Sequence, residues 1–162
     1  MFFPPKKISS VSIYINKLEM NNIVKITDLY ITSIFEDGHW EPIPLSDGFI
    51  YKTVLNEDWS IHDLYISWLK KFNNHPYITT TDQYKELYYS IKREGFRLDT
   101  DVTFKNVEEY LKMYDLCKLP KKSNWQWVIK DGQHRLSILL YFHKNALLEI
   151  DENHIVRRIM YG

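Results

Sequence analysis

One short segment, Asp131–Arg135 with the sequence DGQHR, constrains the fold of this chain more than any other. It lies between a strand-like run at residues 125–130 (WQWVIK) and an apolar, helix-like run at residues 136–143 (LSILLYFH). Because glycine has no Cβ, it lets the backbone turn sharply where a strand leads into a helix. The sequence therefore predicts a strand, a tight turn at Gly132 and a helix, in that order.

The start of this predicted helix has the features of an anion site. The N–H groups of a first helical turn have no intrahelical partner, and the helix dipole places partial positive charge there. Cationic His134 and Arg135 would oppose the dipole, at a cost of roughly 0.3–1 kcal/mol per charge, unless an anion neutralises them. We therefore expect a phosphate site at Gly132, Gln133, His134 and Arg135, with Asp131 placed to bind a metal ion or accept a proton.

A simpler interpretation of the same segment is also open. Asp-Gly between a strand and a helix is common in ordinary α/β proteins, where the aspartate only caps the helix. In that case His134 and Arg135 would lie on the surface of the first turn. The local pattern by itself does not decide between a capped helix and a phosphate site.

The composition predicts one globular domain spanning residues 1–162, because 44% of the residues are hydrophobic and 15% aromatic. The 21 basic and 21 acidic residues cancel, which disfavours sequence-independent binding of nucleic acid. The single cysteine, Cys117, excludes an internal disulfide and a cysteine-based zinc site. Because no apolar run is long enough for a membrane span and the N-terminus lacks a signal-peptide core, we expect a cytoplasmic protein without a membrane partner.

The order of strand-like and helix-like patterns predicts an α+β fold with a small mixed sheet flanked by helices. His62 falls on the aromatic face of one predicted helix, and we expect it to be structural. A second predicted helix has Thr81 or Asp82 as its N-cap and Gly95 just after its end. The predicted strands are 11–15, 28–35, 102–104, 125–130, 147–150 and 155–160, with turns at 19–22 and 36–39 and an extended segment at 40–45; the predicted helices are 56–72, 82–94, 107–114 and 134–143.

Two segments taken together resemble the ParB/sulfiredoxin superfamily: residues 84–95 (YKELYYSIKREG) and residues 127–136 (WVIKDGQHRL). In that superfamily a helix ending in a Ser-Ile-x-x-x-Gly pattern precedes a strand and an Asp-Gly-x-His-Arg turn. The resemblance implies a core over residues 79–150, preceded by variable strands over residues 1–50. Residues 49–59 also resemble a leader segment of uncharacterised members that are associated with surface-polysaccharide gene sets.

The turn separates the branches of the superfamily. Gln133 stands where a sulfiredoxin needs cysteine, which argues against sulfinic acid reduction. About 27 residues follow Arg135, which leaves no room for the helix-turn-helix domain of chromosome-partitioning members. Free-amino-acid kinases, including free-serine kinases, are the most similar in the turn.

The kinase resemblance implies a nucleotide, ATP or ADP with CTP as an alternative, together with Mg²⁺ at Asp131. It also implies that Asp131 and His134 are catalytic, with His75 and Glu41 as candidates for a second catalytic group. Phosphoryl transfer requires mainly electrostatic clamping and positioning of the acceptor, which these residue types can provide. The acceptor would be a small molecule that carries a hydroxyl group.

Two other functions remain open at this stage. One is a non-catalytic, nucleotide-responsive binding module that acts on a protein or DNA partner. The other is a nuclease-like activity, which the neutral charge of the chain disfavours. The sequence defines neither the acceptor nor the oligomeric state.

Overall fold

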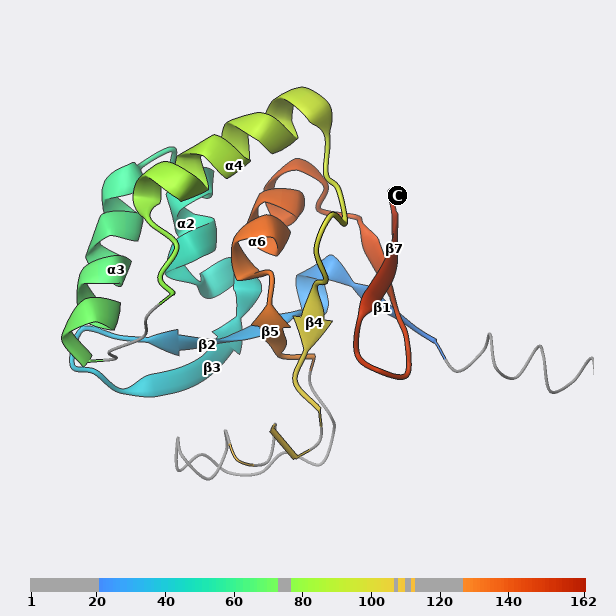
Figure 1. Ribbon diagram of the computed structural model, residues 1–162, viewed down its shortest axis with the longest axis horizontal. Coiled ribbons are helices and arrows are strands. Elements are labelled where there is room, and N and C mark those ends of the chain that lie inside the picture. The colour runs from blue at the N-terminus through green and yellow to red at the C-terminus, as the bar shows by residue number, and fades with distance from the viewer. Residues whose placement is uncertain (1–20, 73–76, 107, 110–111, 113–126) are drawn as a thin grey trace, which may run out of the picture.

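A computed structural model describes residues 21–72, 77–106, 108–109, 112 and 127–162. The predicted strand at 11–15, most of the predicted helix at 107–114 and the candidate residue His75 lie outside the described residues. Within them the fold is α+β, as the sequence predicts, with helices gathered on one side of several short strands (Figure 1). No helix in the described part of the chain is long and apolar enough to cross a membrane.

In the described part of the chain the strands form three small antiparallel sheets. Two isolated bridges join neighbouring sheets, a parallel one between Tyr30 and Val128 and an antiparallel one between Thr103 and Ile155. Prolines cannot donate to a ladder, so the two in β3 keep that strand at an edge. The sheets are β1 (Asn22–Lys25), β6 (Leu147–Ile150) and β7 (Val156–Met160) in the order β1-β6-β7; β2 (Tyr30–Ile34) with β3 (Trp40–Pro44); and β4 (Thr103–Phe104) with β5 (Ile129–Asp131).

The longer helices follow the sequence closely, and their caps explain where they begin and end. The side chain of Thr80 accepts from the N–H of Gln83, and the side chain of Gln83 accepts from the N–H of Thr80, forming a capping box. The helix N-cap is therefore Thr80, and the predicted caps, Thr81 and Asp82, lie inside the helix. Gly95 ends it with a φ of 88°, as expected. The described helices are α2 (Phe49–Leu55), α3 (Trp59–Phe72), α4 (Thr81–Glu94) and α6 (Gln133–Phe142), with short 3₁₀ turns at Ile26–Asp28 and Leu45–Asp47.

Two elements have no counterpart in the sequence prediction. The helix α2 has only seven residues, too few for a helical period to be recognised, yet it buries Ile50, Tyr51 and Val54 against α3 and α6. The strand β1 starts at Asn22, inside the predicted turn at 19–22, and the connection to β2 is the 3₁₀ turn that follows β1. Both elements are short and depend on partners that are distant in the sequence.

The helix α6 lies at the centre of the fold and packs against α2 and α4 (Figure 1). Residues 136–140 are all buried, so nearly every side of this helix faces the core. A helix buried on all sides lacks an amphipathic pattern, which agrees with the run LSILLYF at residues 136–142, where only Ser137 breaks the apolar sequence. Its first turn begins with Gln133, His134 and Arg135, the last three residues of the DGQHR segment.

Candidate functional site

The DGQHR segment adopts the predicted strand, turn and helix. The strand β5 ends at Asp131, and α6 begins at Gln133. Gly132 between them has a φ of 106°, in the left-handed region that favours glycine. A Cβ at this position would lie 3.0 Å from both Cγ atoms of the buried Val102. Gly132 also has no side chain to cap α6, so the N–H groups of the first turn receive no side-chain cap from it.

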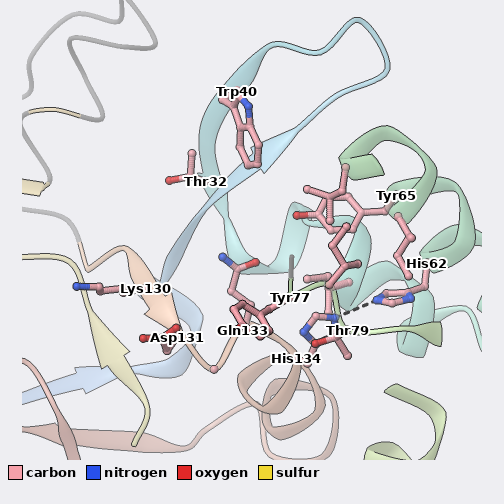
Figure 2. Close-up of a pocket in the computed structure, with 15 residues that line it drawn as sticks. Thr32, Trp40, His62, Tyr65, Tyr77, Thr79, Lys130, Asp131, Gln133 and His134 are labelled. Carbon is pink, nitrogen blue, oxygen red and sulfur yellow. Dashed lines mark hydrogen bonds between the residues drawn. The ribbon is translucent and has the colours of Figure 1, made fainter. Parts of the chain in front are cut away.

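A cavity of about 290 Å³ opens at this first turn. Residues 130–134 form one wall, and the aromatic rings of Trp40, Tyr65 and Tyr77 lie around the remainder together with residues 78–79 (Figure 2). Four of the five DGQHR residues line the cavity. The structure thus brings the predicted turn together with side chains from β2, β3 and α3, which are far from it in the sequence.

At the base of the cavity, His134 is joined to a chain of hydrogen bonds that runs to the surface. Its Nε2 lies 2.9 Å from Nε2 of His62 on α3 (Figure 2). On the other side of the His62 ring, Nδ1 lies 2.8 Å from Oγ1 of Thr81. The hydroxyl of Thr81 in turn donates to Oδ1 of Asp63 at 2.5 Å. We call these four residues the histidine chain.

Both histidines of this chain are neutral at pH 7. Burial lowers the pKa of His62 to about 4, although nearby Asp63 acts in the opposite direction. Burial, and to a lesser extent the neighbouring His62, lower the pKa of His134 to about 3. The sequence predicted His134 as a cation that clamps phosphate, and the structure corrects this to a neutral ring. The groups at this cavity that could attract an anion are therefore the helix amides and Lys130.

Arg135 is directed away from this cavity. Its Nη1 donates to the carbonyl of Thr100 at 2.7 Å, and its Nη2 donates to the carbonyl of Asp101 at 3.1 Å. These two bonds fix the segment before β4 against the start of α6. Arg135 is not among the residues that line the cavity, and its role in phosphate binding stays a prediction.

Asp131 and Lys130 lie at the mouth of the cavity. Asp131 is exposed, and its Oδ2 accepts from the hydroxyl of Thr103 at 3.3 Å. Lys130 has its Nζ 2.9 Å from Oε2 of Glu109. Within the described ranges no three histidine, cysteine or acidic side chains are grouped for a metal ion, so the metal role of Asp131 also stays a prediction.

Of the two other predicted catalytic residues, Glu41 is not brought to this cavity. Glu41 lies on β3, where its Oε2 is 3.3 Å from Nε2 of His39, and only its neighbour Trp40 lines the cavity. His75 lies outside the described residues. Glu41 therefore does not supply a second catalytic group at this cavity.

The residues that the sequence prediction missed are His62, Thr81 and Asp63. His62 was expected to be structural, and its full burial agrees with that expectation, but its ring also contacts His134. The two histidines are 72 residues apart in the sequence, so no local pattern links them. The available signal was the spacing of His62, Tyr65 and Leu69 on one face of α3, all of which line the cavity.

No protein-family model matches this chain, and neither the curated proteins nor the solved structures contain a match to it. The resemblance to the ParB/sulfiredoxin superfamily therefore stays a prediction from residues 84–95 and 127–136.

Proposed function

We propose that this chain is a nucleotide-dependent phosphotransferase that moves a phosphoryl group from ATP or ADP to a small molecule carrying a hydroxyl group. One observation carries the proposal: a single cavity contains both the uncapped start of α6 and a neutral histidine. The first feature suits a phosphate, and the second suits the removal of a hydroxyl proton. The similarity of the turn to kinases of the ParB/sulfiredoxin superfamily supports the same conclusion.

The phosphates would bind at the turn between β5 and α6. The N–H groups at the start of α6 point outward without a side-chain cap, and the helix dipole favours an anion there. Lys130 and the amide of Gln133 line the same wall and can add one positive charge and two N–H donors. The left-handed conformation of Gly132 allows the backbone to approach the anion closely.

The size of the cavity limits what it encloses. Its volume of about 290 Å³ lies at the small end of ligand pockets, which span roughly 300–1,000 Å³. The cavity therefore suits phosphoryl groups and a small acceptor, with the nucleoside lying toward the mouth. The rings of Trp40 and Tyr77, which also line the cavity, offer apolar and aromatic contacts to such ligands.

The reaction needs one new bond and one broken bond. The acceptor oxygen attacks the terminal phosphorus, and the bond between that phosphorus and the bridging oxygen breaks with its electron pair remaining on the departing nucleotide. The hydroxyl proton passes to a base in the cavity. Mg²⁺ keeps several waters and needs only one or two carboxylates beside the phosphates, so Asp131 at the mouth would be the residue that holds it. When bound, the ion would neutralise phosphate charge.

A thermal-shift titration tests the phosphate site. ATP, ADP and CTP are added with and without Mg²⁺, and binding should raise the melting temperature by mass action. The Lys130→Met variant should show a smaller shift, because it removes a cation from the cavity wall. Lys144→Met is the matched control, since Lys144 is exposed beyond the C-terminal end of α6.

Phosphoryl transfer is then followed by ³¹P NMR with a panel of hydroxyl acceptors that includes free serine, glycerol and simple sugars. A phosphomonoester signal that appears together with the departing nucleotide supports the proposal. No thermal shift with any nucleotide contradicts it. Thermal shifts without product from any acceptor contradict the transfer step and favour the non-catalytic binding module instead.

A further inference from the structure

The hydrogen bonds of the histidine chain have one consistent direction. The hydroxyl of Thr81 has a single proton, and it donates that proton to the carboxylate of Asp63, which can only accept. Oγ1 of Thr81 must therefore act as an acceptor toward Nδ1 of His62, 2.8 Å away. It follows that Nδ1 of His62 carries the ring proton.

The same reasoning fixes the proton on His134. A neutral imidazole carries one N–H proton, so Nε2 of His62 is unprotonated. Its lone pair accepts from the Nε2–H of His134 at 2.9 Å. Nδ1 of His134 is then unprotonated. Among the described residues, Nδ1 of His134 has no hydrogen-bond partner. The one buried side-chain atom without a partner there is Oγ of Ser137, so Nδ1 of His134 is not enclosed and is open to the cavity that His134 lines.

We propose that Asp63, Thr81 and His62 form a proton relay that makes Nδ1 of His134 the general base of the cavity. This inference rests on the proposed function, because it names the group that accepts the hydroxyl proton of the acceptor. As that proton reaches Nδ1, the Nε2 proton of His134 moves to Nε2 of His62. The Nδ1 proton of His62 moves to Thr81, whose own proton moves to the carboxylate of Asp63. His134, His62 and Thr81 each gain one proton and give up one, and Asp63 gains one.

The relay resolves a difficulty that a single histidine would face here. Burial holds the pKa of His134 far below its ordinary value, so the ring is a poor place to leave a positive charge. Asp63 is exposed, and a proton that neutralises it can pass on to water. The relay therefore carries the charge from a water-poor cavity to the surface, and no imidazolium has to persist inside the protein.

Three helices hold the relay in place. His62 and Asp63 are consecutive on α3, Thr81 is the first residue of α4, and His134 lies in the first turn of α6. Thr80 carries the capping box of α4, which leaves the hydroxyl of Thr81 available to the relay. His134 touches the reacting hydroxyl in this scheme, whereas His62, Thr81 and Asp63 are positioning residues that act through it.

The direct test is ¹⁵N NMR of the histidine rings at pH 7, because an unprotonated ring nitrogen resonates well downfield of a protonated one. We expect the downfield signal of His134 to be Nδ1 and that of His62 to be Nε2. A proton on Nδ1 of His134 would overturn the proposal. The measurement uses the wild-type chain without any ligand, so its result does not depend on turnover.

Substitutions at Thr81 test whether the relay sets these tautomers. In Thr81→Val the side chain keeps its shape but cannot accept from His62, so His62 should carry its proton on Nε2 and His134 on Nδ1. Thr81→Ser retains the hydroxyl and should retain the wild-type tautomers. In the phosphotransfer assay, Thr81→Val should lower kcat roughly tenfold or more with little change in KM, and Thr81→Ser should recover most of that loss. Unchanged tautomers in Thr81→Val would overturn the proposal.

A charge control separates the relay from a general electrostatic effect. Asp63→Asn and Asp82→Asn each remove one exposed carboxylate close to Thr81, but only Asp63 accepts from its hydroxyl. The relay predicts a lower kcat for Asp63→Asn alone, and equal losses in the two variants would overturn its last step. Nucleotide binding by thermal shift is measured in parallel. If the wild-type tautomers are as expected but no nucleotide shifts the melting temperature, the phosphotransferase function is rejected and the assignment of His134 as a base is retained.

Discussion

Two groups of histidine in this protein have opposite electrostatic properties. In the hairpin between β2 and β3, Nδ1 of His39 contacts Asp37 and its Nε2 lies 3.3 Å from Glu41, and these carboxylates raise the pKa of His39. The side chain of His39 is 50% exposed. In the cavity, burial lowers the pKa of His62 and of His134.

The comparison shows that a carboxylate near a histidine does not by itself determine the charge of the ring. Both groups contain a carboxylate, but the hydrogen bonds join Asp63 to His62 only through the hydroxyl of Thr81. In the hairpin the carboxylates contact the ring directly, and water solvates the resulting charge. In the cavity desolvation outweighs the attraction. The hairpin histidine therefore suits a weak surface ion pair, and the buried pair suits proton transfer.

The largest expected effect is on kcat, and it should distinguish the cavity histidines from the hairpin histidine. Replacing His134 by Gln removes the base and should lower kcat for phosphoryl transfer about 10²–10⁴-fold, the usual contribution of general base catalysis. His39→Gln is the matched control and should leave kcat unchanged, because His39 lies outside the cavity. Steady-state kinetics with the best acceptor from the panel gives both values. Similar losses in the two variants would remove the distinction between the groups.

The second prediction concerns the pH dependence of stability. The unfolded chain takes up protons on His62 and His134 below about pH 6.5, whereas the folded protein resists protonation until about pH 4 and pH 3. The unfolded state thus binds more protons, and the free energy of unfolding should fall as the pH decreases from 6.5 to 4. Each histidine contributes a slope of up to about 1.4 kcal/mol per pH unit. Urea unfolding at several pH values measures the slope, and His134→Gln should reduce it.

The contribution of His39 in the hairpin to the pH dependence of stability should have the opposite sign. Because the folded pKa of His39 is raised, its contribution is fully present below about pH 6.5 and is lost as the pH rises through that pKa. His39→Gln should therefore lower stability at pH 6 and have no effect at pH 9. A loss that is larger at pH 9 than at pH 6 would show that carboxylates do not stabilise the charged ring.

The last prediction compares a glycine in each region. Gly38 of the hairpin and Gly132 of the cavity both have positive φ, so alanine should cost roughly 1–2 kcal/mol at either position. A Cβ at Gly38 meets the exposed ring of Phe72, which can move aside, whereas a Cβ at Gly132 meets the buried Val102. Gly132→Ala should cost about 1–3 kcal/mol more than Gly38→Ala because of this overpacking. Urea unfolding of the two variants gives the difference, and equal costs would mean that Val102 can yield.

Much of the local structure could be predicted from the sequence. Gly132 between a β-rich run and an apolar run predicts the turn, and the structure places it in the left-handed conformation there. Gly95 predicts the end of α4, and the predicted N-caps, Thr81 and Asp82, lie one and two residues after the observed N-cap, Thr80. The short elements α2 and β1 could not be predicted, because seven and four residues carry too little pattern to be recognised.

The sequence by itself determined the strand, turn and helix of the DGQHR segment, because glycine geometry and hydrophobic patterning act over a few residues. Only the tertiary structure decided that His62 faces His134, that the hydroxyl of Thr81 joins them to Asp63, and that Arg135 binds backbone carbonyls outside the cavity. These contacts link positions up to 72 residues apart. The charge of His134 was likewise decided by packing, since desolvation depends on what surrounds a ring in space and not on its neighbours in the chain.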